Sequence, residues 1–221
     1  MMKNNLSKTS KLDGVLSWSL QAGAPSAGGT CSGSVTEDGA LVPACSGCYA
    51  TTGCYSFRDT KRVRIENKEA WKDPEWVPEM IRALSKSKYF RWFDSGDVYS
   101  LELAEKIYAV MVGTPNVKHW IPTRMGKFAK FYPILSAMAR LPNVMVRFSS
   151  DSVLGEYTPG LHGSTILPSA SDASDNVFVC RAYENDGKCS GCRACYSKDI
   201  PVIGYVQHGR KMAKVIRLAV A

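Results

Sequence analysis

Eight cysteines lie in two groups far apart in the sequence, and their spacing is typical of metal sites. The first group consists of Cys31, Cys45, Cys48 and Cys54. The second group consists of Cys180, Cys189, Cys192 and Cys195. Two cysteines separated by two residues can bring both thiolates to one metal across a tight turn. All eight are therefore candidate metal ligands.

The second group has the stronger signal. Three of its cysteines follow one another as Cys-x-x-Cys-x-x-Cys, a dense spacing that bacterial ferredoxins use around a four-iron, four-sulfur (4Fe-4S) cluster. The pattern favours an iron-sulfur cluster, one or two per chain. Zinc is the alternative, because four thiolates also satisfy a tetrahedral zinc ion. The first group fits iron-sulfur and zinc equally well. The two groups could also contribute ligands to one shared site. Cys54 is the cysteine least expected to bind a metal.

The cellular compartment bears on the choice between metals and disulfides. The first thirty residues contain no apolar run of signal-peptide length, and no later segment approaches a membrane span. The sequence thus predicts a soluble protein of the cytoplasm without membrane contact. Thiols stay reduced there, so the cysteines are expected to bind metal or do redox chemistry.

The chain is strongly basic. It has 28 lysines and arginines against 20 acidic residues, a formal net charge of +8. Such an excess favours nucleic acid or a nucleotide as partner. An ordinary solvated basic surface explains it equally well, because the basic clusters at 61–64 and 210–217 have no interleaved aromatic residues.

From about residue 88 onward, six short apolar runs read as strands: YFRWFDS, VKHWIPT, NVMVRFSS, STILPSA, NVFVCRA and PVIGYVQ. Helical spacing follows the first run over 100–116 and the second over 126–143, and another helix is expected from about Pro78. Alternating strands and helices predict a mostly parallel sheet. We expect an α/β fold, a partial or open β/α barrel of about six strands, with cysteine-rich loops at both ends of the chain.

One domain is expected over residues 1–221. It would comprise a cysteine-rich loop region (1–60), a β/α core (61–179) and a cysteine-rich C-terminal extension (180–221).

Polar residues follow several of the expected strands. Ser95, Gly96 and Asp97 end the first run, and in a β/α barrel they would lie at the carboxyl-end face, where active sites are built. Gly96 permits close backbone approach and Asp97 can accept hydrogen bonds, which predicts a cofactor-binding turn. The alternative is a plain strand end in which Asp97 caps the next helix. Polar residues at 123–124 and 149–151 would lie on the same face.

His208 has two interpretations. It could bind metal or phosphate beyond the second cysteine group, but a surface histidine in a basic tail is the simpler one.

The sequence resembles a phage family known as the gene product 88 type. The similarity lies in KTSKLDGVLSWSL, CSGCYA, FRWFDSGDVYS and VCRAYENDGKCSGCRACYS, and it spans most of the chain. It implies a virus or prophage origin, and hence the host cell cytoplasm, without implying a defined activity.

A more distant resemblance is to radical S-adenosylmethionine (SAM) enzymes. It implies that the CSGCYA loop binds a 4Fe-4S cluster and that Ser95, Gly96 and Asp97 stand where such enzymes hold SAM. The second cysteine group would then resemble an auxiliary-cluster extension. The spacing departs from that family's Cys-x-x-x-Cys-x-x-Cys, because thirteen residues separate Cys31 from Cys45.

Three hypotheses follow. The chain is an iron-sulfur enzyme, radical SAM-like or otherwise, that acts on a nucleotide or nucleic acid. Alternatively, it is a zinc-stapled nucleic-acid-binding protein without catalysis, or an electron-transfer or redox protein.

Overall fold

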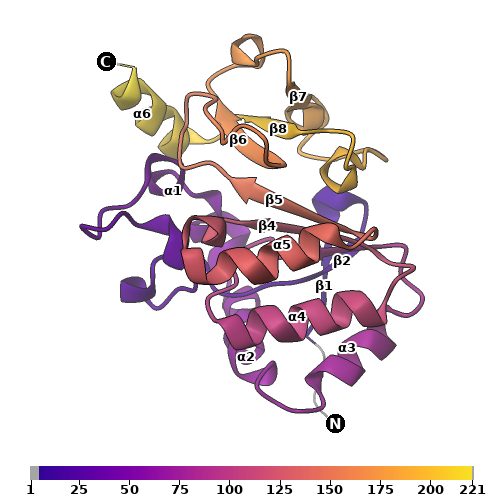
Figure 1. Ribbon diagram of the computed structural model, residues 1–221. Coiled ribbons are helices and arrows are strands. Elements are labelled where there is room, and N and C mark those ends of the chain that lie inside the picture. The colour runs from indigo at the N-terminus through magenta and orange to yellow at the C-terminus, as the bar shows by residue number, and fades with distance from the viewer. Residues whose placement is uncertain (1–4, 221) are drawn as a thin grey trace.

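A computed structural model describes residues 5–220 and contains a single eight-stranded sheet (Figure 1). The strands are β1 (Ser7–Thr9), β2 (Val15–Trp18), β3 (Tyr89–Trp92), β4 (Lys118–Thr123), β5 (Val144–Ser149), β6 (Gly163–Leu167), β7 (Val177–Cys180) and β8 (Val202–Val206). Their order is β1-β2-β3-β4-β5-β6-β8-β7, and every pair except β1 with β2 is parallel. The sheet is open, with β1 and β7 at its two edges.

Helices cover one face of the sheet. The helices are α1 (Pro43–Ser46), α2 (Arg58–Ala70), α3 (Trp76–Leu84), α4 (Leu101–Gly113), α5 (Tyr132–Arg140) and α6 (Arg210–Ala219). Helices α3, α4 and α5 lie side by side over β2 to β5 (Figure 1). Helix α6 instead packs against α1, where Met212 and Ile216 meet Ala44.

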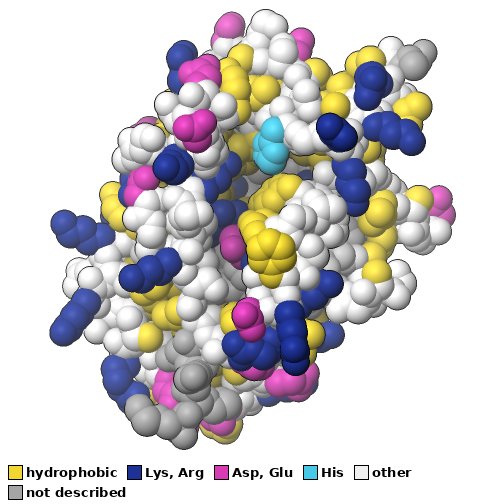
Figure 2. Space-filling view, turned by 180° about the vertical axis from the view of Figure 1, so that it is seen from behind, with side chains coloured by type: hydrophobic (Ala, Val, Ile, Leu, Met, Phe, Trp, Pro, Cys, Tyr) yellow, Lys and Arg dark blue, Asp and Glu magenta, His cyan; other side chains and the backbone are white. Residues whose placement is uncertain are grey.

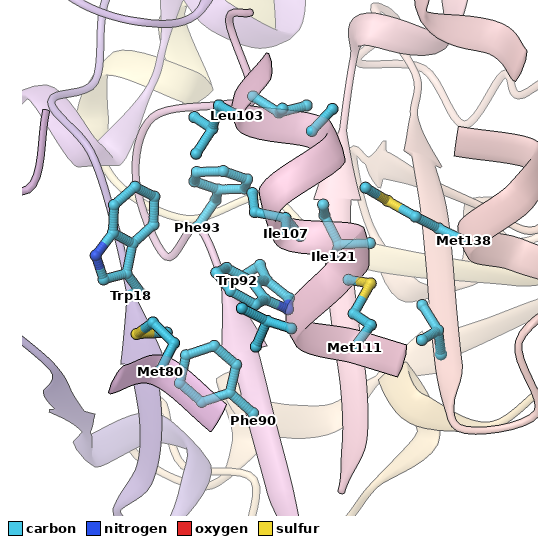
Figure 3. Close-up of a cluster of buried hydrophobic side chains, with 14 of the residues drawn as sticks. Trp18, Met80, Phe90, Trp92, Phe93, Leu103, Ile107, Met111, Ile121 and Met138 are labelled. Carbon is cyan, nitrogen blue, oxygen red and sulfur yellow. The ribbon is translucent and has the colours of Figure 1, made fainter. Parts of the chain in front are cut away.

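The main core lies between these helices and the sheet. Because successive residues of a strand point to opposite faces, Phe90 and Trp92 of β3 share the helix side with Trp18 of β2. Trp18 and Trp92 pack edge to face at 6.1 Å, and the side chains of α4 close over them (Figure 3). Buried aromatic side chains of this size contribute much of a core's apolar area.

The other face of the sheet, here called the second face, carries the intervening residues. Strand register places Arg91 of β3 beside Ser17 and Trp120, and Trp120 beside Met145. This face has no α3, α4 or α5 over it. The connection between β7 and β8, residues 181–201, covers part of it, with Tyr196 packed on Trp120.

The α/β class and the mostly parallel sheet are confirmed, while the sheet is open and the partial-barrel part of the expectation stays a prediction. All six apolar runs are strands (β3 to β8), and α3, α4 and α5 lie where helices are expected, although α3 begins at Trp76 rather than near Pro78. The expected number of about six strands is too low, because β1 and β2 also join the sheet. Helices α2 and α6 are not anticipated by the sequence analysis either.

The C-terminal segment is no appendage, because β8 lies inside the sheet between β6 and β7. Within residues 5–220, no helix is both long and apolar enough to cross a membrane.

His119 of β4 gives the core a defined pH dependence. Its Nδ1 accepts from Trp92 Nε1 (3.3 Å), and its Nε2 lies 2.9 Å from Thr114 Oγ1, whose own proton goes to Val110 O. The neutral imidazole with its proton on Nε2 satisfies both contacts. Burial lowers the pKa of His119 from 6.5 to about 4.

Unfolding should therefore be favoured by acid. Between pH 6.5 and 4 the unfolded chain binds a proton that the folded chain excludes, so stability is lost as pH falls, by at most about 1.4 kcal/mol per pH unit. Urea denaturation at pH 7 and 4.5 measures this. In His119→Asn, which keeps an acceptor for Trp92, the loss between these pH values should shrink. An unchanged loss would assign the acid sensitivity to other groups.

Candidate functional site

The carboxyl ends of the parallel strands β3, β4 and β5 lie side by side, as the sequence predicts. This row of strand ends is a different edge of the sheet from the outer strands β1 and β7. Asp97 organises this edge: its Oδ1 accepts from Thr123 Oγ1 (2.7 Å) and the Val98 amide (2.8 Å), and its Oδ2 accepts from the Arg124 amide (2.9 Å). Asp97 is only 6% exposed, and burial raises its pKa to about 6. It does not cap α4, whose first turn is capped by Ser100.

The Ser95 side chain and the Gly96 backbone pack against the loop at 20–30. The Ser95 hydroxyl donates to Leu20 O (2.8 Å) and accepts from Arg64 Nε. Gly96 has φ +76°, and a Cβ there would lie 2.7 Å from both Leu20 Cβ and Thr30 Oγ1. The close approach expected at Gly96 is therefore present, but its partner is the loop at 20–30. That loop leads directly into Cys31, so the turn positions the first cysteine group.

Three cysteines of the first group lie together at this edge. Burial raises the pKa of Cys31 to about 12, and the nearby charges of Asp97, Cys45 and Cys48 raise it further. Cys54 is exposed, whereas Cys31, Cys45 and Cys48 are partly buried. Which of the four bind a metal stays a prediction.

The loop that carries Cys45 and Cys48 is anchored to the ends of β4 and β5. The Ala44 amide donates to Asp151 O (3.0 Å), and the Asp151 carboxylate accepts from Arg124 Nε (3.2 Å) and Lys127 Nζ (2.8 Å). Arg124 also lies against Gly33, where a Cβ would be only 2.6 Å from Arg124 Cβ. The polar strand ends at 123–124 and 149–151 therefore hold this cysteine loop in place.

All four cysteines of the second group line one cavity of about 300 Å³. The cavity lies on the second face, and its other walls include Leu12, Phe178, Tyr196 and Ile203. Burial raises the pKa of Cys189 to about 11 and also raises that of Cys195, whose Sγ lies 3.4 Å from the Tyr205 hydroxyl. No cysteine of the first group lines this cavity, so the two groups occupy different places in the structure.

The loop at 181–201 reaches the turn between β1 and β2. The Cys189 amide donates to Lys11 O (2.8 Å). The Asp13 carboxylate accepts from the Gly191 amide (3.0 Å) and from Arg193 Nη1 (2.9 Å). The loop that carries the second cysteine group follows β7 at one edge of the sheet and is hydrogen-bonded to the β1–β2 turn at the other edge.

Arg147, in the middle of β5, holds the same loop against the second face through hydrogen bonds. It is 0% exposed, and its guanidinium donates to six backbone carbonyls, at Gly163, Ala194, Cys195, Ser197, Ile200 and Pro201. Five of them belong to residues 194–201. No carboxylate of residues 5–220 lies within 4.0 Å of it, so it is a buried cation without an ionic partner.

The side chains of residues 5–220 that could bind a metal do not converge on a single point. In the part of the chain described, no three cysteine, histidine or carboxylate side chains are arranged to hold a single metal ion. The four thiols of the second group surround a cavity rather than one point.

Sequence reasoning missed several residues of the second face. Arg91 and Arg147 are charged residues inside apolar strand runs, FRWF and MVRF, and that interruption is the signal that could have identified them. Tyr49 and Tyr55 carry no comparable signal. His208 is exposed, which agrees with the simpler interpretation, and its ring lies 6.0 Å from that of Tyr49.

Comparison with known proteins yields one match. The model of the family described as Gene product 88 matches residues 2–217. No curated protein and no solved structure gives a significant match.

Arg147 can be tested through the loop that it holds. In Arg147→Met, five carbonyls of residues 194–201 lose a charged donor, so we expect a loss of about 3 kcal/mol or more in the free energy of unfolding. Limited proteolysis should cut within 181–201 before the rest of the chain. Arg82→Met, at an exposed site on α3, is the matched control and should leave both measurements unchanged. Equal behaviour of the two variants would refute the anchoring role.

Proposed function

The chain belongs to the Gene product 88 family of phage proteins, and from that premise we propose that it is an iron-sulfur protein with an enzymatic role. The single observation that carries the proposal is the cavity of about 300 Å³ lined by Cys180, Cys189, Cys192 and Cys195. These four thiolates would hold a 4Fe-4S cluster, one thiolate to each iron.

The surroundings of the second group support an anionic occupant. Four thiolates on a cluster leave a net negative charge, which is costly to bury unless cations or hydrogen-bond donors compensate it. Arg147 and Arg91 are both buried on this face, and both influence the pKa of Cys195. Their charges would offset that of the cluster.

Zinc fits the second group less well. A zinc ion needs all four sulfurs at about 2.3 Å from one point. The four thiols instead line a cavity, and no single-ion arrangement of three ligands occurs in residues 5–220. In a cluster with four irons each thiolate binds a different iron, so the four sulfurs need not converge on one point.

The first group supports the enzymatic part of the proposal. Cys31, Cys45 and Cys48 lie together while Cys54 lies apart, so three thiolates would bind a second cluster and leave one iron position open. An open position is what SAM or a substrate requires. The group also lies at the carboxyl ends of parallel strands that follow one another in chain order, as they would in a partial β/α barrel.

The protein's own residues would then shape the open position. Asp97 influences Cys31 and is hydrogen-bonded to the ends of two strands, so it holds a carboxyl group at a fixed place beside the first group. Burial raises the pKa of Cys45, and the charges of Arg124 and Lys127 oppose that rise and favour its thiolate. Ser95 and Gly96 would act only by fixing the loop before Cys31.

Metal analysis of protein purified without oxygen tests the proposal. We expect about eight irons and eight acid-labile sulfides per chain, from two clusters. Cys192→Ala should lose about half of both. Cys54→Ala is the matched control, because Cys54 is likewise exposed, and it should retain all of the iron. Zinc without sulfide would defeat the proposal and leave a zinc-stapled binding protein.

The open position has its own measurement. Added SAM should change the electron spin-resonance spectrum of the reduced wild-type protein and of Cys192→Ala, but not that of Cys31→Ala. Iron with sulfide but no response to SAM in any of the three would retain the iron-sulfur protein and remove SAM from the proposal.

A further inference from the structure

Helix α6 carries a basic face on the side that points away from the protein. Its Met212 and Ile216 are buried against Ala44 of α1. Its four cations are all exposed: Arg210, Lys211, Lys214 and Arg217. Because an α-helix turns by about 100° per residue, the first, third and fourth of these lie within about 60° of one another, on the other side of the helix from the buried pair.

The charge of this basic face is not compensated within the described chain. No carboxylate of residues 5–220 lies within 4.0 Å of any of the four cations. Arg217 Nε donates to Ala213 O within the helix (3.3 Å), a contact that leaves its charge unbalanced. Cations of one sign along one helix face favour a polyanion as partner.

Helix α6 lies in direct contact with the loop of the first cysteine group. Gly47 separates Cys45 from Cys48, and a Cβ at Gly47 would lie only 2.8 Å from Met212 Cα. The loop can therefore approach α6 this closely only because residue 47 has no side chain. A partner bound along α6 would lie next to the first cysteine group.

Tyr49, directly after Cys48, places an aromatic ring between this loop and α6. Its ring lies 6.0 Å from that of His208, two residues before α6, and 5.5 Å from that of Tyr55. Its hydroxyl donates to Asp94 O, just beyond β3 (3.3 Å). These contacts hold the ring in place, yet Tyr49 is 48% exposed. The basic cluster at 210–217 has no aromatic residue of its own, but the fold supplies one on which an unpaired base can stack.

The surroundings of α6 favour nucleic acid over a membrane surface. The apolar residues of α6 that face α1 are buried, so they cannot insert into a bilayer as those of an interfacial helix would. Figure 2 shows basic side chains gathered at the corner where α6 lies, with hydrophobic side chains next to them. A single strand supplies phosphates for the cations and unpaired bases for the ring.

We propose that α6 and Tyr49 bind a single strand of nucleic acid, with its phosphates along Arg210, Lys214 and Arg217 and a base on the Tyr49 ring. The inference rests on the proposed function and deepens it, because it names the substrate class of an enzyme whose open iron lies at the first cysteine group. DNA and RNA share this chemistry.

Fluorescence anisotropy of the full-length protein, purified without oxygen, tests the basic face. The probes are labelled twenty-residue oligothymidylate and oligouridylate, titrated over a range of salt concentrations. The double variant Lys214→Gln, Arg217→Gln should bind roughly tenfold more weakly at about 0.15 M salt. The slope of log affinity against log salt should become shallower by about 1.4, because each phosphate contact on a single strand contributes about 0.7.

The matched control is the double variant Arg82→Gln, Lys86→Gln. It removes the same charge from exposed side chains on α3 and just after it, away from α6 (Figure 1). It should bind like wild type, which separates a local surface from an effect of net charge.

The aromatic part of the surface has its own variants. Tyr49→Ala should weaken binding about tenfold and leave the salt slope unchanged, because stacking involves no phosphate. Tyr49→Phe keeps the ring and should bind like wild type.

The outcomes decide between partners. Tighter binding of oligothymidylate or of oligouridylate identifies DNA or RNA as the strand. The proposal is overturned by wild-type binding in the α6 double variant or in Tyr49→Ala, by an equal loss in the α3 control, or by the absence of binding in wild type. Tighter binding of a duplex, or binding of phosphatidylglycerol vesicles in place of the strand, overturns it as well.

Iron and sulfide are measured in the same samples. Strand binding that depends on α6 in protein without iron would retain this surface and reject the iron-sulfur function. Iron and sulfide without strand binding would do the reverse.

Discussion

The second cysteine group depends on one buried guanidinium, that of Arg147. A connection of about twenty residues that crosses a sheet face must find donors for its carbonyls, because buried backbone groups without partners destabilise the fold. Arg147 supplies donors to five carbonyls of residues 194–201 at once, from the middle of β5. This places Cys195 over the second face and lets Tyr196 pack on Trp120, while Asp13 and Lys11 hold the far side of the loop.

The first cysteine group depends on a different constraint, the order of the strands. Strands β2 to β6 are parallel and follow one another in the chain, so their carboxyl ends collect at one edge. Asp97 joins the ends of β3 and β4, and Asp151 joins β5 to the loop of Cys45 and Cys48. The first cysteine group is therefore held at the carboxyl ends of the strands. The second group is held over the second face of the sheet, so the two groups lie at different places.

The sequence predicts those parts of the fold whose patterns are long and regular. Strands β3 to β8 and helices α4 and α5 have clear apolar periodicity. Strands β1 and β2 are only three and four residues long and join the sheet through tertiary pairing. Helix α2 is rich in charged residues and has few apolar positions. Helix α6 is clearly amphipathic, with Met212 and Ile216 buried on one face, so its periodicity is present in the sequence, where 210–217 is interpreted only as a basic cluster. Spacing identifies the cysteines as candidate ligands, but the exposure of each one follows only from three-dimensional packing. The same holds for Ser95, whose hydroxyl serves the loop before Cys31.

The two buried arginines of the second face differ in how their charge is accommodated. Both interrupt apolar strands, and burial of either charge opposes folding. At Arg147 six carbonyls offset that cost, so packing and hydrogen bonding within the chain account for the residue. At Arg91 the guanidinium stacks on the Trp120 ring, with its carbon 4.6 Å from the ring centroid, and the buried Nε has no hydrogen-bond partner in residues 5–220. The backbone of the 194–201 segment therefore accounts for one arginine, and an aromatic ring of the neighbouring strand holds the other.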